Sequence, residues 1–275
     1  MNERTILITG CSSGIGQCVA HGLANHGYRV FATARRQADV EQLNSAGLES
    51  LLLDLSDSGS INRAVDAILD RTDGRLDALF NNGAYGQMGA VEDLSREVLR
   101  TQFETNLFGW HELTNRVLPV MRDQGHGRII HNSSVLGFVA LPFRGAYNAS
   151  KYALEGLADT LRLELRGSGI YVSLVEPGPI TSRFRENAFA VYKKTINPEI
   201  SVHREKYRRL EQRLTTTGPV VPFTLPAEAV LKKVIKALES PRPRARYYVT
   251  FPTYLFAALK RVLTDRALDR ILAKV

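Results

Sequence analysis

The sequence predicts an α/β protein with one doubly wound parallel sheet of about seven strands, helices on both faces, and a single domain spanning residues 1–275. Short apolar runs alternate with longer segments whose apolar residues recur at helical spacing. A glycine-rich turn follows the first apolar run and opens the first helix-like segment. We find no internal repeat, low-complexity linker or second domain.

The elements follow from this alternation in chain order. Apolar runs predict strands over residues 5–9, 29–34, 51–55 and 78–81, a strand beginning at residue 128, and further strands over 170–176 and 247–249. Helical spacing predicts a helix from the glycine turn to about Gly27, another around residues 61–69, and a long one over 95–118 that Pro119 stops. Further helices are expected from Tyr147, from Pro226 and over 253–275.

Composition narrows the function classes. Hydrophobic residues make up 44% of the 275 residues, which is ordinary for a soluble globular protein, and no stretch has the length of a membrane-spanning helix. The N-terminus runs straight into an apolar strand and does not resemble a secretory signal. Cys11 and Cys18 form neither a disulfide framework nor a metal motif, and the six histidines lack ligand spacing. We therefore expect a cytoplasmic protein with no metal.

The net charge of +8 raises the question of an anionic partner. The excess is spread over several segments, and no helix-turn-helix or zinc-finger spacing accompanies it. We therefore expect no nucleic-acid binding. A membrane-surface protein that uses its basic terminal helix is kept as an alternative.

The glycine turn predicts a dinucleotide site. Glycines let the backbone turn tightly and approach a pyrophosphate, while a helix N-terminus offers free amides to its charge. The turn lies between a strand and a helix, as this role requires. The residues assigned to it are Gly10, Ser12, Ser13, Gly14, Ile15 and Gly16.

Tyr147 and Lys151 are the strongest candidates for chemistry. Their spacing of four residues places both side chains on one helix face, a turn apart. An ammonium beside a phenol favours the phenolate, so we expect the pKa of Tyr147 to lie below its usual value of about 10. A tyrosine tuned in this way exchanges protons with an alcohol or carbonyl oxygen. A solvated helix face is the alternative for this pair taken alone.

Other residues extend the pattern. Ser134 follows an apolar strand, Asn106 lies in the long helical run, and Thr9 precedes the glycine turn. Together these motifs resemble the short-chain dehydrogenase/reductase family, from about residue 5 to residue 181, with order and spacings intact. Asn81-Asn82-Gly83-Ala84 departs from the family's Asn-Asn-Ala-Gly by exchanging its last two residues.

The resemblance implies a Rossmann-type fold and catalytic roles for Asn106, Ser134, Tyr147 and Lys151. Tyr147 would be the proton donor or acceptor, Ser134 would bind the substrate oxygen, Lys151 would hold the nicotinamide ribose, and Asn106 would disturb its helix to support a proton relay. The resemblance also implies cofactor contacts at Asp54, Asn81, Pro177, Gly178 and Thr181. A helix cap for Asp54, a structural Asn106 and an ordinary turn at Pro177 remain alternatives.

Arg35 predicts the choice of cofactor. In this fold an acid at the end of the second strand binds the ribose hydroxyls of NAD, but Ala34 stands there and Arg35 follows. An arginine pairs with a 2′-phosphate, so we expect NADP (NADPH). The alternative is that Arg35 and Arg36 are surface charges.

Within the family, the glycine turn and the end of the second strand look like the branch of 17β-hydroxysteroid and retinol dehydrogenases and related aldehyde reductases. This resemblance implies a bulky apolar carbonyl or alcohol substrate and a homodimer or homotetramer. Segment 182–225 would cover the substrate. The residues expected near the nicotinamide, unless they are simply core, are Tyr85, Met88, Leu136, Phe138, Leu141 and Phe143. A redox-sensing NADP-binding protein without turnover is the alternative of another class.

Overall fold

The structure is a computed structural model, and it describes residues 4–274. Its centre is a parallel seven-stranded sheet of order β3-β2-β1-β4-β5-β6-β7, which confirms the predicted fold class. The strand order reverses between β1 and β4. The strands are β1 (Thr5–Ile8), β2 (Arg29–Ala34), β3 (Glu49–Leu52), β4 (Ala78–Asn81), β5 (Gly127–Asn132), β6 (Ile170–Glu176) and β7 (Arg246–Tyr248).

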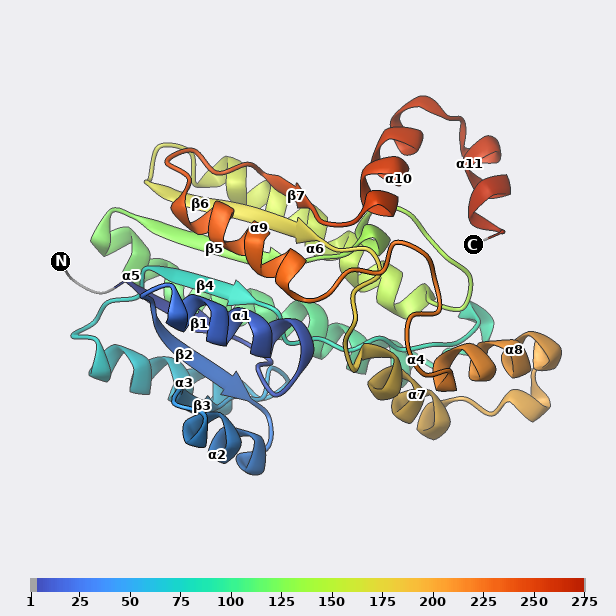
Figure 1. Cartoon of the computed structure of the whole chain (residues 1–275), viewed down its shortest axis with the longest axis horizontal. Helices are drawn as coiled ribbons and strands as arrows, with labels where there is room; N and C mark the ends of the chain where they lie inside the picture. The colour runs from blue at the N-terminus through green and yellow to red at the C-terminus, as the bar shows by residue number, and fades with distance from the viewer. Residues whose placement is uncertain (1–3, 275) are drawn as a thin grey trace.

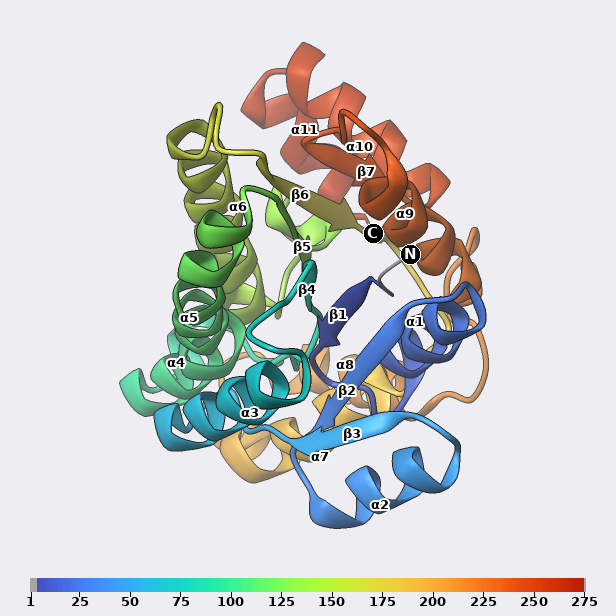
Figure 2. The same ribbon diagram turned by 90° about the vertical axis from the view of Figure 1, so that its left-hand side faces the viewer.

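Helices cover both faces of this sheet (Figure 2). One core cluster joins α1 (Gly14–Asn25), α2 (Gln37–Ser45) and α9 (Glu228–Glu239) to the sheet. The cluster on the other face contains α3 (Ser58–Arg71), α5 (Gly109–Gln124) and α6 (Gly145–Glu164). Because both faces are covered, the inner strands are buried almost throughout and read as continuous apolar runs.

The remaining elements lie mainly beyond the carboxyl ends of the strands (Figure 1). They include α7 (Phe184–Thr195) and α8 (Arg204–Thr215), which lie within segment 182–225, and α10 (Phe251–Val262) and α11 (Asp265–Leu272) near the C-terminus. The short elements are η1 (Val91–Asp93), α4 (Arg96–Phe103), the π-helix η2 (Glu104–Phe108), η3 (Val135–Gly137) and η4 (Pro198–Ile200).

The long helix predicted over 95–118 is wrong in two respects. The π-helix η2 interrupts it, and Pro119 lies inside α5 instead of ending it. Proline in a helix interior costs about 3 kcal/mol, but residues on both sides of it, Val117, Leu118 and Met121, are buried in the core and hold the helix together. The helix ends at Gly125, whose left-handed φ of 72° suits a glycine.

Two other boundaries also differ from the prediction. The third strand covers Glu49–Leu52, not 51–55. Beyond Leu52, the side chains of Leu53 and Leu55 pack into the core cluster that contains α3. The single helix expected over 253–275 is two helices, α10 and α11, separated at Leu263 and Thr264. Val275 lies outside the described residues. The break allows Leu268 and Leu272 to turn inward against the site described below.

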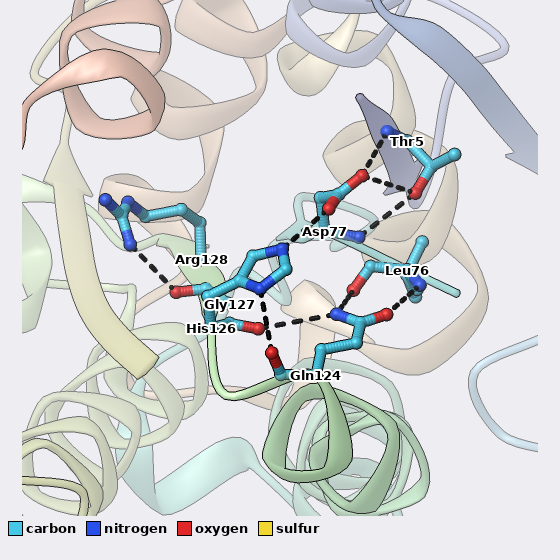
Figure 3. A network of polar contacts seen from close by, with 7 residues as sticks. All are labelled: Thr5, Leu76, Asp77, Gln124, His126, Gly127 and Arg128. Carbon is cyan, nitrogen blue, oxygen red and sulfur yellow. Dashed lines mark hydrogen bonds and ion pairs between the residues drawn. The ribbon is translucent and has the colours of Figure 1, made fainter. Parts of the chain in front are cut away.

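A polar network fastens the amino ends of the central strands (Figure 3). The Asp77 carboxylate accepts hydrogen bonds from the Thr5 amide at 2.7 Å and the Thr5 hydroxyl at 3.0 Å, and it lies 2.9 Å from Nε2 of His126. Gln124 bonds both backbone groups of Leu76, at 2.8 and 3.1 Å. This network ties β1, β4 and β5 together at the end of the sheet opposite the candidate site.

Within residues 4–274, the structure contains no helix that is both long enough and apolar enough to span a membrane.

Candidate active site

The predicted site residues gather at the carboxyl ends of the strands, next to the reversal of strand order between β1 and β4. In open α/β sheets this is where ligands bind. Tyr147 and Lys151 come from α6, Ser134 follows β5, and Asn106 comes from η2. The glycine turn follows β1.

Two glycines of the turn are required by close contacts. Gly10 has a left-handed φ of 71°, and a Cβ there would lie 2.5 Å from Cα of Gly83. A Cβ on Gly16 would lie 2.1 Å from the carbonyl oxygen of Gly10. The Thr9 hydroxyl accepts hydrogen bonds from the amides of Asn82 and Gly83, at 2.8 and 2.9 Å. These hydrogen bonds hold the glycine turn against the segment that follows β4.

The N-terminus of α1 is free to bind an anion. Ser13 is the N-cap residue, but its side chain makes no capping bond within the described chain. Gly14, with a φ of 59°, Ile15 and Gly16 begin the helix, and Ser12 is exposed beside them. The first amides of a helix lack intrahelical partners and favour negative charge. The turn and the helix end thus fit the pyrophosphate of a dinucleotide.

Arg35 and Arg36 differ in their partners. The Arg36 guanidinium forms a forked ion pair with Asp39, at 2.7 and 2.8 Å. Arg35 is exposed, follows the buried Ala34, and makes no hydrogen bond or ion pair within residues 4–274. Burial raises the pKa of Tyr85 to about 12, and the positive charge of Arg35 opposes that rise. Arg35 is therefore the arginine available to an anionic ligand at this edge.

The side chains of Asp54 and Asn81, which were expected to contact the cofactor, are hydrogen-bonded to groups of the protein. Asp54 accepts from the amide and hydroxyl of Ser56, while Asp57 is the residue that caps α3. Asn81 is fully buried, and its Nδ2 lies 3.1 Å from the Thr114 hydroxyl and 3.2 Å from Nδ1 of His131. The Asn81 side chain therefore faces the interior, where its amide nitrogen is engaged by Thr114 and His131.

Asn82 holds the glycine turn in place and was not among the site residues predicted from the sequence. Its Nδ2 donates to the carbonyl oxygens of Thr9 and Gly10, and its Oδ1 accepts from Asn132 at 2.9 Å. Side chains alternate between faces in an extended chain. This alternation was the available signal, because it sends Asn81 inward and Asn82 toward the glycine turn.

Asn106 lies in the π-helix, which confirms that the helix is disturbed there. Its Oδ1 accepts from the Tyr85 amide at 3.2 Å, and its Nδ2 donates to the Tyr85 carbonyl at 2.9 Å. A further contact joins Nδ2 to the Ser150 hydroxyl at 3.3 Å. Asn106 thus fixes the segment after β4 against α6 at Ser150, the residue that precedes Lys151.

Ser134, Tyr147 and Lys151 are brought together. All three are buried, the Ser134 hydroxyl accepts from the Leu136 amide at 3.1 Å, and it lies close enough to Tyr147 to influence the pKa of the phenol. Nζ of Lys151 donates to the carbonyl oxygen of Asn132 at 2.8 Å and lies 4.2 Å from the centre of the Trp110 ring. The Ser134 hydroxyl and the Tyr147 phenol therefore lie in one apolar pocket, and the Lys151 amine lies on the next turn of α6.

The expectation that Lys151 lowers the pKa of Tyr147 is wrong for this arrangement. Burial raises the pKa of Tyr147 to about 12, and the Ser134 hydroxyl beside it opposes the rise without cancelling it. Burial also lowers the pKa of Lys151 to about 7, against the charge of Glu155. Nζ of Lys151 lies 5.7 Å from the centre of the Tyr147 ring. Desolvation outweighs the attraction between ammonium and phenolate at this separation.

The loop after β6 is fixed on two sides. The Pro177 carbonyl accepts from the Val135 amide at 2.8 Å, and a Cβ on Gly178 would lie 2.2 Å from the Thr250 hydroxyl. Thr181 is exposed, and its amide donates to the Leu225 carbonyl at 2.9 Å. The loop therefore lies directly beside the turn that carries Ser134. The exposed side chain of Thr181 lies in the same loop.

Apolar residues from distant segments cover Tyr147. The Phe184 ring packs edge-on against it, with ring centres 5.3 Å apart, and Leu268 and Leu272 of α11 belong to the same cluster. Leu136, Phe138 and Leu141 are also in this cluster, as expected. Met88 and Phe143 instead pack with α7 and α8 in a separate cluster. Phe184 lies in segment 182–225, which was expected to cover the substrate, whereas Leu268 and Leu272 were not predicted at the site.

A cluster of buried charged residues lies next to Ser133, the residue that precedes Ser134. The Glu155 carboxylate accepts from the Ser133 hydroxyl at 2.5 Å and pairs with Arg246 at 3.0 Å. Arg246 also pairs with Asp159 at 2.7 Å, and its Nε lies 3.1 Å from fully buried Glu176. Because Arg246 is shared among three carboxylates, it compensates Glu176 only in part. Burial, followed by the charge of Glu155, raises the pKa of Glu176 to about 9.

Glu176 therefore makes stability fall as pH rises. Between its ordinary pKa of 4.5 and about 9, the folded chain keeps a proton that the unfolded chain releases. We expect the Tm to decline across this window and the Glu176→Gln variant to lose most of that decline. Thermal unfolding at a series of pH values checks this, with the exposed Glu97→Gln as control. An unchanged slope in Glu176→Gln would contradict the assignment.

The comparisons with known proteins agree with this geometry. The model of the short chain dehydrogenase family matches residues 4–193, and the chain belongs to that family. It is 44% identical over 270 residues to the "uncharacterized oxidoreductase YbbO" of Escherichia coli (strain K12), covering 98% of this chain and 94% of the relative. It is 33% identical over 263 residues to human 17-beta-hydroxysteroid dehydrogenase type 1, covering 91% and 78%. The expected resemblance to that branch is confirmed.

A solved structure also matches over nearly the whole chain. It is a short chain dehydrogenase/reductase from Burkholderia phymatum in complex with NAD, with a TM-score of 0.78 and 26% identity, covering 98% of this chain and 95% of that one. The family uses nicotinamide cofactors of the NAD and NADP type and consists of oxidoreductases. This chain is therefore an oxidoreductase of the short-chain type.

Proposed function

We propose that the protein is an NADPH-dependent reductase that converts an apolar aldehyde or ketone to its alcohol. The observation that carries this proposal is the arrangement of the Tyr147 hydroxyl, which is buried beside Ser134 in an apolar pocket, with Lys151 one turn further along α6. The phenol is protonated at neutral pH, since burial raises its pKa. It can donate a proton to a carbonyl oxygen, which is the step that reduction requires.

Each residue then has a separate task. Ser134 donates a hydrogen bond to the substrate carbonyl oxygen and aligns it with Tyr147, which donates the proton. Lys151, fixed by the Asn132 carbonyl, would hold the nicotinamide ribose. The amides at the start of α1 would hold the pyrophosphate. When bound, the nicotinamide supplies the hydride.

The proposed cofactor preference depends on Arg35. The chain lacks an acid at the end of β2 that would bind both ribose hydroxyls of NAD, and the Arg35 guanidinium is not engaged by any residue among 4–274. A guanidinium binds phosphate in a fork through two parallel hydrogen bonds. NADP carries a 2′-phosphate where NAD carries a hydroxyl, so these two features favour NADPH.

The lining of the pocket supports an apolar substrate. Phe184 and the two leucines of α11 close over Tyr147 and present no charge to it. Hydrophobic pockets gain about 0.8 kcal/mol for each methylene that they bury. We therefore expect catalytic efficiency to rise with the length of the apolar chain on the substrate.

Self-association is proposed through α4, α5 and α6, the helices after β4 and β5. Helices α4 and α6 and the adjoining π-helix leave several large apolar side chains exposed, among them Leu99, Phe108, Leu157 and Leu163. Exposed apolar side chains are typical of sites where two copies meet. They would support the expected homodimer or homotetramer.

A panel of aldehydes and ketones with NADPH tests the proposed activity through the loss of NADPH absorbance. We expect turnover with straight-chain aldehydes and a kcat/KM that rises with chain length. The paired change Leu268→Ser and Leu272→Ser should flatten this dependence, since it removes apolar surface at Tyr147. Tight NADPH binding without turnover of any carbonyl compound would refute the proposal and favour a redox-sensing protein.

A further inference from the structure

An exposed apolar surface lies on the outer side of α10. Phe251, Leu255, Ala258 and Val262 are exposed and recur at the spacing of one helix face, whereas Thr253 and Ala257 face inward and are buried. The exposed fractions are 55% for Phe251, 40% for Leu255 and 81% for Val262. The α10 patch consists of Phe223, Phe251, Tyr254, Leu255 and Val262.

Phe223 extends this patch from another segment. It adopts a left-handed φ of 61°, which is unfavourable for any residue with a bulky side chain. Its ring is nevertheless 57% exposed and lies 4.9 Å from the ring of Phe251, measured between centres. The loop before α9 therefore holds an unfavourable backbone and presents an aromatic ring at the surface beside α10.

Basic residues flank the patch. Lys233 of α9 contacts the Tyr254 hydroxyl at 3.2 Å, and Lys232, Lys233 and Lys236 line a shallow groove of about 520 Å³ beside Val249. α10 itself contains no acidic residue and ends with Lys260 and Arg261. In residues 228–262 the acids are Glu228 and Glu239, and Glu239 is paired with Arg4 and His26. Among the basic residues of this stretch, Arg246 belongs to the buried charge cluster and Lys260 donates to the Phe138 carbonyl. The others are Lys232, Lys233, Lys236, Arg242, Arg244 and Arg261.

We propose that the α10 patch docks on the surface of an anionic lipid bilayer. An apolar helix face bordered by lysine and arginine matches the acyl boundary and the charged headgroups of such a surface. A second copy of the chain fits the patch less well. A twofold interface would bring two copies of the same lysine-rich surface together, and the like charges would repel.

The position of the patch also suits an apolar substrate. The inner side of the same two helices contributes Phe256, Leu259, Leu263 and Leu268 to the cluster around Tyr147. α10 and α11 lie together beyond the carboxyl ends of the strands (Figure 1). Docking through α10 would hold the entrance of the apolar pocket near the bilayer. The docking itself does not depend on the proposed reductase activity.

Sedimentation of the full-length protein with vesicles tests the docking. We expect binding to vesicles of phosphatidylcholine mixed with phosphatidylglycerol, weaker binding at high salt, and little binding to phosphatidylcholine alone. The variant Phe251→Ser, Leu255→Ser, Val262→Ser should partition at least about tenfold less. The variant Lys232→Gln, Lys236→Gln, Arg261→Gln should lose about fivefold for each charge that contacts the bilayer.

The control is Ile200→Ser with Val202→Ser, which removes two side chains that are 83% and 84% exposed on the α7–α8 side of the molecule. This variant should bind the mixed vesicles like the unmodified protein. The proposal is wrong if the unmodified protein stays in the supernatant. It is also wrong if the control loses as much binding as the α10 variant, or if the α10 variant breaks an oligomer, as seen by light scattering, and still binds vesicles.

Discussion

Replacing Tyr147 with phenylalanine is expected to lower the rate of carbonyl reduction by about 10²- to 10⁴-fold, the usual cost of losing general acid catalysis. The ring would remain, so its packing against Phe184 and the α11 leucines would be kept. Only the hydroxyl would be lost, and with it the proton that the carbonyl oxygen needs. NADPH binding should change little, and fluorescence titration measures it separately from turnover.

Tyr152 provides a matched control for this substitution. It lies on the same helix, its ring is 39% exposed, and its hydroxyl is bonded by Lys260 and not by Ser134. Tyr152→Phe should reduce the substrate at close to the unmodified rate. If Tyr147→Phe did the same, the assignment of the proton donor would be wrong.

Replacing Ala34 with aspartate and Arg35 with alanine is expected to erase or reverse the preference for NADPH. One hydrogen bond to a charged group contributes about 1.5–3 kcal/mol, which corresponds to a tenfold to hundredfold difference in affinity. The unmodified protein should therefore bind NADPH at least about tenfold more tightly than NADH. Calorimetric dissociation constants for both cofactors check this expectation.

The neighbouring arginine separates a specific contact from general surface charge. Arg36→Ala removes the same charge, but its guanidinium is already committed to Asp39. This variant should retain the preference for NADPH, and Arg35→Ala should lose most of it. Equal dissociation constants for the two cofactors in the unmodified protein would mean that both arginines are ordinary surface charges.

The sequence was sufficient for the sheet, the glycine turn and the grouping of Ser134, Tyr147 and Lys151. These features depend on local patterns: apolar runs, helical spacing, and glycines that no other residue can replace. They also depend on strand ends that parallel pairing brings to one edge. The roles assigned to the individual site residues remain predictions.

What the sequence could not supply depends on contacts between distant segments. The raised pKa of Tyr147 comes from burial under Phe184 and α11, which lie far along the chain. Pro119 stays within its helix because tertiary packing on both sides of it outweighs the local penalty. The break between α10 and α11 contains no glycine or proline that would have predicted it from the sequence. In each case contacts with residues far along the chain, and not the local sequence, decide the outcome.

The transfer of deuterium from deuterated NADPH to an apolar aldehyde tests the central claim most directly. NADPH labelled with deuterium on the transferable position of the nicotinamide ring is incubated with the unmodified protein and a straight-chain aldehyde, and the alcohol is analysed by mass spectrometry. We predict an alcohol that carries one deuterium on the former carbonyl carbon, with one NADPH consumed for each alcohol formed. An alcohol without the label, or NADPH that stays unconsumed across the aldehyde panel, would contradict the claim.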